Sequence, residues 1–177
     1  MNDVQISKFI SYVLRHNPKG KVISEDGWMD LKDLLELLNI EFSYTIELDD
    51  VMRVVSENDK QRFKINENKI RASQGHTLKK IKIELIPRTP PDILYHGTKK
   101  QILKIIKKEG LKKMNRHHVH LSAERKTAEI VARRWHQGIL ILEIDTRSMH
   151  LDGYVFYLSD NGVWLTDKIP PRYIKFM

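Results

Sequence analysis

The stretch ILYHGTKKQILKIIKKEG, residues 93–110, decides the fold predicted for the second half of this 177-residue chain. An apolar, β-favouring run leads to Gly97 and Thr98, and a lysine-rich segment follows. The pattern predicts a strand that ends at Gly97, a helix capped by the Thr98 hydroxyl, and a glycine stop at Gly110. The apolar face of that helix consists of isoleucines with i, i+3 and i+4 spacing: Ile102, Ile105 and Ile106.

His96 stands at the predicted break between the strand and the helix. A helix N-terminus exposes backbone N–H groups and a positive dipole end, which favour an anionic ligand. The His96 side chain at such a turn can point into a cleft. The alternative is a purely structural turn in which a neighbouring carbonyl bonds to the imidazole, and this stretch by itself favours that alternative.

The amino-acid composition limits the classes of protein to which the chain can belong. Hydrophobic residues make up 41% of the chain and charged residues 31%, a balance typical of globular domains. The chain contains no cysteine, which excludes disulfides, thiolate metal sites and a cysteine nucleophile. The net charge of +8 favours a polyanionic partner, nucleic acid first. No apolar run approaches the ~20 residues that span a bilayer, and no signal peptide is recognisable, so we expect a cytoplasmic protein without a membrane partner.

The first half reads as three short helices followed by a β-hairpin, an order typical of a winged helix, which is a common nucleic-acid-binding module. Arg15 and His16 fall in the last turn of the first helix, before Asn17-Pro18, where capping of the helix dipole is the structural alternative to a function. Trp28 is expected in the core. The predicted helices span residues 4–16, 31–38 and 45–57, and the hairpin strands span 62–65 and 69–72. Asp30 is the expected N-cap of the second helix. The expected apolar face of the first helix consists of Ile6, Phe9, Ile10, Val13 and Leu14. The inward positions expected in the third helix are Leu48, Val51, Met52 and Val55.

The second half is richer in β-structure. The proline-rich segment 87–91 is the best linker candidate, so we place the domain boundary there, with domains 1–86 and 87–177. The chain is predicted to be α+β, with a compact mixed sheet and two helices in the second domain. Ser122 is expected to cap the helix that follows it. Strands are predicted over residues 81–85, 116–121, 139–144, 153–157, 163–166 and 173–176.

Five short segments, taken in order, carry a resemblance to a known family. They are SYVLRH (11–16), IRASQGH (70–76), LYHGT (94–98), HVHLS (118–122) and NGVWL (161–165). Together they resemble the RNA 2′-phosphotransferase family, NAD-dependent enzymes that remove a 2′-phosphate from RNA, including the splice-junction phosphate of tRNA. The resemblance implies an N-terminal winged-helix RNA-binding lobe and a C-terminal NAD-binding lobe with an ADP-ribosyltransferase-like mixed sheet.

The resemblance also implies the site residues. Arg15, His16 and Arg71 match three members of the family's catalytic set, and the fourth is an arginine in the helix after Ser122. Counting forward from Val131 selects Arg134, with Arg133 as the rival, because Ala132 replaces the family's glycine and an extra residue follows. The NAD-binding positions implied by the resemblance are His96, Gly97, Thr98, His120, Ser122, Asn161, Gly162 and Val163.

The family reaction consumes NAD in two steps. A 2′-phosphate oxygen of RNA displaces nicotinamide from its ribose, and the ribose 2″-hydroxyl then attacks phosphorus, releasing RNA and ADP-ribose 1″,2″-cyclic phosphate. The three arginines would clamp the phosphate and His16 would transfer a proton. No metal is expected, because His118 and His120 lack cysteine or carboxylate partners in a comparable pattern, and a monomer is expected.

Two other functions stay open. One is an ADP-ribosyltransferase that acts on other phosphorylated nucleic-acid ends or on protein. The other is a non-catalytic winged-helix protein that binds nucleic acid and whose second half only binds a nucleotide.

Overall fold

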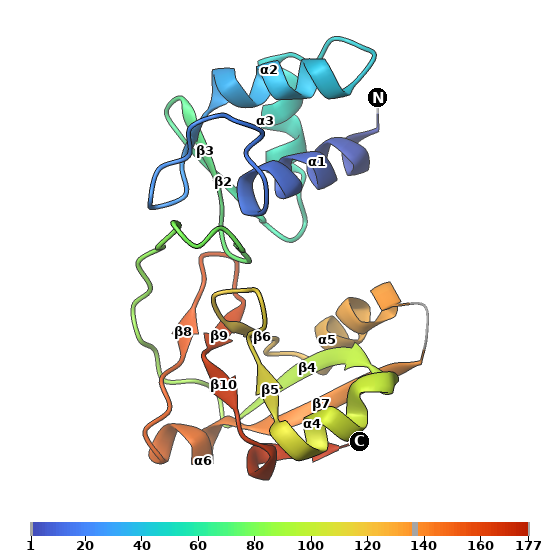
Figure 1. The fold of residues 1–177 in the computed structure, drawn as a ribbon, viewed down its shortest axis with the longest axis vertical. Coiled ribbons are helices and arrows are strands. Elements are labelled where there is room, and N and C mark those ends of the chain that lie inside the picture. The colour runs from blue at the N-terminus through green and yellow to red at the C-terminus, as the bar shows by residue number, and fades with distance from the viewer. Residues whose placement is uncertain (1, 136–137, 177) are drawn as a thin grey trace. The chain divides into compact units, whose positions relative to one another are not determined.

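The computed structural model describes residues 2–135 and 138–176, and the chain divides into two compact units (Figure 1). Unit 1 is Met1–Glu84 and unit 2 is Leu85–Met177, whereas the sequence placed the boundary after residue 86. Each unit combines helices with small antiparallel sheets, so the fold class is α+β. Among the described residues, no helix is both long and apolar enough to cross a membrane.

The described part of unit 1 contains three helices and one three-stranded sheet of order β1-β3-β2. The helices are α1 (Asp3–Arg15), α2 (Leu31–Glu41) and α3 (Leu48–Ser56). The strands are β1 (Met29–Asp30), β2 (Phe63–Asn66) and β3 (Lys69–Ala72). The predicted hairpin is therefore confirmed, and β1 adds a strand to it. The strand predicted over residues 81–85 does not form.

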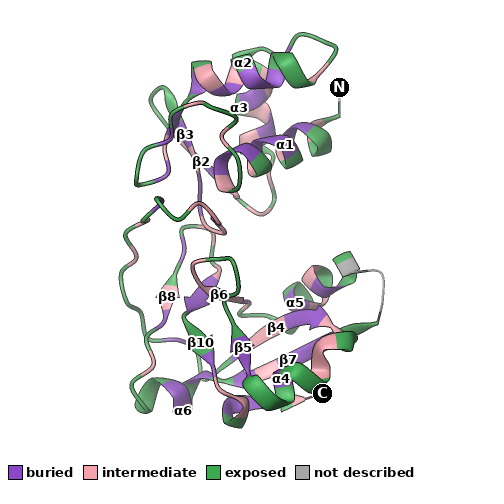
Figure 2. Ribbon diagram, in the orientation of Figure 1, coloured by how far each residue is buried: buried purple, intermediate pink, exposed green. Residues whose placement is uncertain are grey.

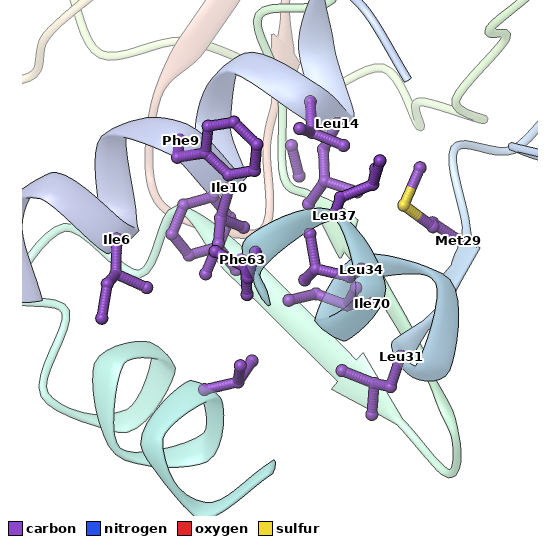
Figure 3. Packing of buried hydrophobic residues seen from close by; sticks show 14 of the residues in the cluster. Ile6, Phe9, Ile10, Leu14, Met29, Leu31, Leu34, Leu37, Phe63 and Ile70 are labelled. Atoms are coloured by element: carbon purple, nitrogen blue, oxygen red, sulfur yellow. The ribbon is translucent and has the colours of Figure 1, made fainter. Parts of the chain in front are cut away.

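One hydrophobic core holds unit 1 together, and buried segments of its helices and strands are marked in Figure 2. The core side chains of α1 point toward α2 and the hairpin (Figure 3). The apolar face predicted for α1 is buried as expected: Ile6, Phe9, Ile10, Val13 and Leu14. The inward face predicted for α3 is partly wrong, because Leu48 and Met52 are 44% and 45% exposed. The helix begins only at Leu48, and Val51 and Val54, three residues apart, bury its inner face instead.

Unit 2 contains three sheets, of orders β11-β7-β4, β6-β9-β8 and β10-β5. Every pairing among its described strands is antiparallel, so the single mixed sheet predicted from the sequence is wrong. Of these described pairs, only β8 and β9 are joined directly by a turn, and the other antiparallel pairs, such as β4 with β7, join strands far apart in the chain, a pairing that local sequence patterns do not specify. The strands are β4 (Ile93–Lys99), β5 (Leu111–Lys112), β6 (Val119–Leu121), β7 (Ile139–Asp145), β8 (Tyr157–Leu158), β9 (Trp164–Thr166), β10 (Lys168–Ile169) and β11 (Ile174–Phe176). The helices are α4 (Leu103–Glu109), α5 (Arg125–Ala132) and α6 (Thr146–Leu151), with the 3-10 turns η1 (Lys100–Ile102), η2 (Arg133–Trp135) and η3 (Pro171–Tyr173).

The segment of residues 93–110 differs from its prediction in two respects. Strand β4 continues through Gly97 and Thr98, because these residues pair with β7, and α4 begins only at Leu103. Thr98 is therefore not the helix cap. Ile106 is buried but Ile105 is 57% exposed, so the predicted apolar face is narrower. Gly110, with φ +75°, ends the helix as predicted.

Candidate active site

His96 lies in the middle of β4, and its ring reaches the neighbouring strand β6. His96 Nδ1 lies 2.8 Å from the backbone oxygen of His120. A carbonyl only accepts hydrogen bonds, so Nδ1 carries the hydrogen and Nε2 is left as an acceptor. Although the residue as a whole is partly exposed, burial of the imidazole lowers the pKa of His96. The hydrogen bond to the His120 carbonyl raises this pKa, and the positive charge of Arg116 lowers it. His96 is therefore a neutral imidazole with a fixed tautomer.

His120 has the opposite tautomer. Arg116 Nη1 lies 2.9 Å from His120 Nδ1. A guanidinium has only donors, so His120 Nδ1 accepts and the hydrogen of the neutral ring is on Nε2. The sequence did not single out Arg116. It falls within the strand predicted over residues 116–121, but β6 begins only at Val119, so Arg116 lies in the turn before the strand.

Ser122 joins the two strands that carry these histidines. Its backbone N–H donates to Tyr95 O at 2.8 Å, and Tyr95 N–H donates to Ser122 O at 2.9 Å. Ser122 does not cap α5 as predicted, because Glu124 occupies that position and the backbone of Ser122 is held in the bridge. We call His96, Arg116, His120 and Ser122 the histidine site.

The predicted segment Asn161, Gly162 and Val163 forms the turn between β8 and β9. The buried Ser159 hydroxyl organises this turn: it lies 2.9 Å from Asn161 Oδ1 and accepts from Val163 N at 3.0 Å. Because β9 pairs with β6, with Leu121 opposite Trp164, the turn lies beside the end of β6 that leads into Ser122. The structure thus brings all three predicted NAD-binding segments of unit 2 to one region.

Gly97 and Thr98 have packing roles that the sequence did not indicate. A Cβ on Gly97 would lie 1.9 Å from the carbonyl oxygen of Ala128, so the glycine allows α5 to approach β4. Thr98 is only 6% exposed and lies within β4. Both residues hold the strand and helix that frame the histidine site.

Arg134 and Arg133 both lie in η2, directly after α5, and both are exposed. Although Arg116 is also exposed, burial lowers the pKa of its guanidinium, and so does the positive charge of Arg134. Arg133 exerts no such effect on Arg116. The electrostatic neighbour of the histidine site is therefore Arg134.

In unit 1, Arg15 and His16 end α1 and contact the segment that follows β3. His16 Nδ1 lies 3.0 Å from the Thr77 hydroxyl, and Thr77 N–H donates to Arg15 O at 2.9 Å. A Cβ on Gly75 would lie 3.6 Å from Arg15 Nε, so the arginine side chain runs along this glycine. The Thr77 contact was missed by the sequence reasoning, since 61 residues separate it from His16.

Arg71 lies on β3, and its guanidinium carbon is 4.8 Å from the centre of the Trp28 ring. Trp28 comes directly before β1, which pairs with β3 and so brings the indole beside Arg71. The tryptophan is only partly buried, so its assignment to the core is wrong. The contact places the guanidinium over the face of the indole, where a cation is attracted by the ring.

The described residues contain no group of three histidine, aspartate or glutamate side chains that could hold a metal ion. The histidine site instead consists of neutral imidazoles beside positive charge. That combination suits phosphate groups, which guanidinium forks bind through paired hydrogen bonds.

Comparison with known proteins agrees with this chemistry. Residues 1–168 match the model of the RNA 2′-phosphotransferase, Tpt1 / KptA family. A probable RNA 2′-phosphotransferase of Fusobacterium nucleatum is 47% identical over 99% of both chains. Proteins of the same description from Rhizobium leguminosarum and Flavobacterium johnsoniae are 43% and 46% identical, each over 97% of this chain and over 93% and 94% of their own. The chain belongs to the RNA 2′-phosphotransferase family, enzymes that act on the 2′-phosphate of RNA.

Proposed function

We propose that this enzyme removes an RNA 2′-phosphate by transferring it to NAD, which is consumed as a co-substrate. The observation that carries the proposal is the bond of His96 Nδ1 to His120 O at 2.8 Å, with Ser122 bridged to Tyr95 alongside it. Residues that matched separate family motifs are joined there into one site. Arg134 and Arg116 add positive charge, which suits the diphosphate of a dinucleotide.

In the first proposed step, a 2′-phosphate oxygen of RNA attacks C1″ of the nicotinamide ribose, and the C1″–N bond breaks. Nicotinamide leaves as a neutral molecule, and the RNA is ADP-ribosylated on its phosphate. The nucleophile is already an anion, so positioning rather than acid–base catalysis is the main requirement. His96, His120, Ser122 and the 161–163 turn are proposed to orient NAD for this step.

In the second proposed step, the ribose 2″-hydroxyl attacks phosphorus and the bond from phosphorus to the RNA 2′-oxygen breaks. The products are RNA with a 2′-hydroxyl and ADP-ribose 1″,2″-cyclic phosphate. Arg15, Arg71 and Arg134 are proposed to stabilise the charge that develops on phosphorus. His16 is proposed to move the proton from the attacking hydroxyl toward the leaving oxygen.

The assignment of His16 is supported by its Thr77 contact. The Thr77 hydroxyl also lies 3.4 Å from Arg15 O, to which it can donate. It can then accept from His16 Nδ1–H, which makes Nε2 the basic nitrogen of the neutral ring.

The lobe assignments are part of the same proposal. We propose that unit 1 is a winged-helix RNA-binding lobe, supported by its order of three helices and a hairpin. We propose that unit 2 is the NAD-binding lobe of ADP-ribosyltransferase type, supported by the family membership of the chain.

The test is to incubate the protein with NAD and an RNA bearing one internal 2′-phosphate, with the unphosphorylated RNA as control. The expected result is stoichiometric loss of the 2′-phosphate, with nicotinamide and the cyclic product identified by mass spectrometry. A stable ADP-ribosyl adduct on RNA or protein would favour the other transferase activity. RNA binding without NAD consumption would show a binding protein.

A further inference from the structure

Arg116 takes part in the hydrogen bonds that link the residues of the histidine site. Its Nη1 donates to His120 Nδ1 at 2.9 Å, and the backbone oxygen of the same His120 accepts from His96 Nδ1 at 2.8 Å. Arg116, His120 and His96 thus form one chain of hydrogen bonds. Because arginine only donates, this bond excludes a hydrogen on His120 Nδ1 and presents Nε2–H away from Arg116.

The charges around Arg116 are all of one sign. Arg134 is near enough for its charge to lower the pKa of Arg116, and Arg116 in turn lowers the pKa of His96. In the part of the chain that the structure describes, neither Arg116 nor Arg134 forms an ion pair with a carboxylate. Two neighbouring guanidinium groups without an acid repel each other, and an anion bound at Arg116 relieves part of that repulsion.

We propose that Arg116 is a positioning and anion-binding residue of this enzyme. It holds His120 as the Nε2–H tautomer and binds a phosphate group of the dinucleotide with its remaining donors. The inference rests on the proposed function, because the dinucleotide is the co-substrate proposed there.

The chemistry of the guanidinium suits both tasks at once. One of its five N–H donors is used by His120, and the residue is exposed, so the other donors can reach a ligand. The shared chemistry is phosphate recognition, and two sources could supply it: the diphosphate of NAD or the 2′-phosphate of RNA. Arg116 lies beside His96 and His120, which matched the NAD-binding motifs. This position favours the diphosphate of NAD over the 2′-phosphate of RNA.

The first test reads the tautomer without any substrate. ¹⁵N NMR of the His120 ring in the full-length protein should show a bare Nδ1 and a protonated Nε2. In Arg116→Ala, both tautomers of His120 should appear, whereas Arg133→Ala should leave the His120 spectrum unchanged. An unchanged His120 tautomer in Arg116→Ala would overturn the positioning role.

The second test measures binding of NAD and of 2′-phosphorylated RNA separately by calorimetry. Arg116→Ala should weaken NAD binding about tenfold or more, as expected for one charge-assisted hydrogen bond, and leave RNA binding within about twofold. Arg116→Lys should recover part of the loss, and the KM for NAD should rise more than kcat falls. Weaker RNA binding with unchanged NAD binding would assign Arg116 to the RNA phosphate and overturn the dinucleotide assignment. Failure of the wild-type protein to bind NAD would instead refute the proposed function, while the NMR result would stand.

Discussion

The Thr77 hydroxyl lies 3.0 Å from His16 Nδ1, although 61 residues separate the two along the chain. Thr77→Val removes that hydroxyl and keeps the backbone bond from Thr77 N to Arg15 O. We expect 2′-phosphate removal to slow about tenfold, because His16 loses the group that fixes its tautomer. Thr77→Ser is the matched control and should retain most of the rate in single-turnover assays. Equal rates for Thr77→Val and wild type would show that His16 needs no such partner.

The stacking of Arg71 on Trp28 leads to a second prediction. Trp28→Leu removes the ring 4.8 Å from the guanidinium carbon, and the Arg71 guanidinium is held less firmly without that contact. Since such contacts are worth about 1 kcal/mol, we expect turnover to fall about three- to tenfold. Trp28→Phe keeps an aromatic face, so its turnover in the same steady-state assay should lie between those of wild type and Trp28→Leu. A loss as large in Trp28→Phe as in Trp28→Leu would point to lost packing rather than stacking.

Alanine substitutions of the two arginines of η2 are expected to have different effects on turnover. Arg134→Ala should accumulate ADP-ribosylated RNA, because the charge that develops on phosphorus in the second step loses one clamp. Arg133→Ala should leave turnover almost intact, since only Arg134 acts electrostatically on Arg116. Mass spectrometry of the RNA during a time course distinguishes the two. The reverse pattern would assign the clamp to Arg133.

Gly97→Ala tests the packing of α5 on β4. The added methyl would lie 1.9 Å from the Ala128 carbonyl oxygen, so the helix must move away. We expect a loss of about 3 kcal/mol in the free energy of unfolding, at the upper end of overpacking effects. Gly153→Ala is the control, because its positive φ of +88° costs about 1 kcal/mol but the methyl meets no neighbour. Denaturant titration measures both, and similar losses would show that α5 yields easily.

The neutral state of His96 predicts a pH dependence of stability. Burial lowers the pKa of His96 below its ordinary 6.5, so the folded chain stays unprotonated while the unfolded chain takes up a proton as pH falls. The free energy of unfolding should therefore decrease below pH 6.5, by at most about 1.4 kcal/mol per pH unit for one group. Denaturant titrations of His96→Gln over that range should show a shallower slope.

His118 also contributes to the pH dependence of the free energy of unfolding, so its contribution has to be measured separately. Its pKa is also lowered mainly by burial, against the opposing charge of Asp167, so it contributes in the same direction. His118→Gln alone and combined with His96→Gln separate the two contributions. A slope unaffected by His96→Gln would mean that the His96 ring protonates freely in the folded state.

The sequence predicted the local elements well where one signal decided them. The apolar spacing of α1 and the capping residue Asp30 of α2 depend on neighbours a few positions apart, and both are confirmed. Where a partner strand decided the outcome, the prediction failed. Thr98 has the chemistry of a helix cap, but pairing with β7 keeps it in a strand.

The sequence by itself determined the family, the residue types and the order of elements, because these are carried by short motifs that need no partner to be recognised. Only the tertiary structure decided which other residues contact the residues of these motifs. No sequence pattern marked Thr77, Trp28 or Arg116 as a partner of these motifs, and contacts made across turns and strand pairs bring them to His16, Arg71 and His120. Hydrogen bonds and stacking depend on distance in space, which the chain order does not specify.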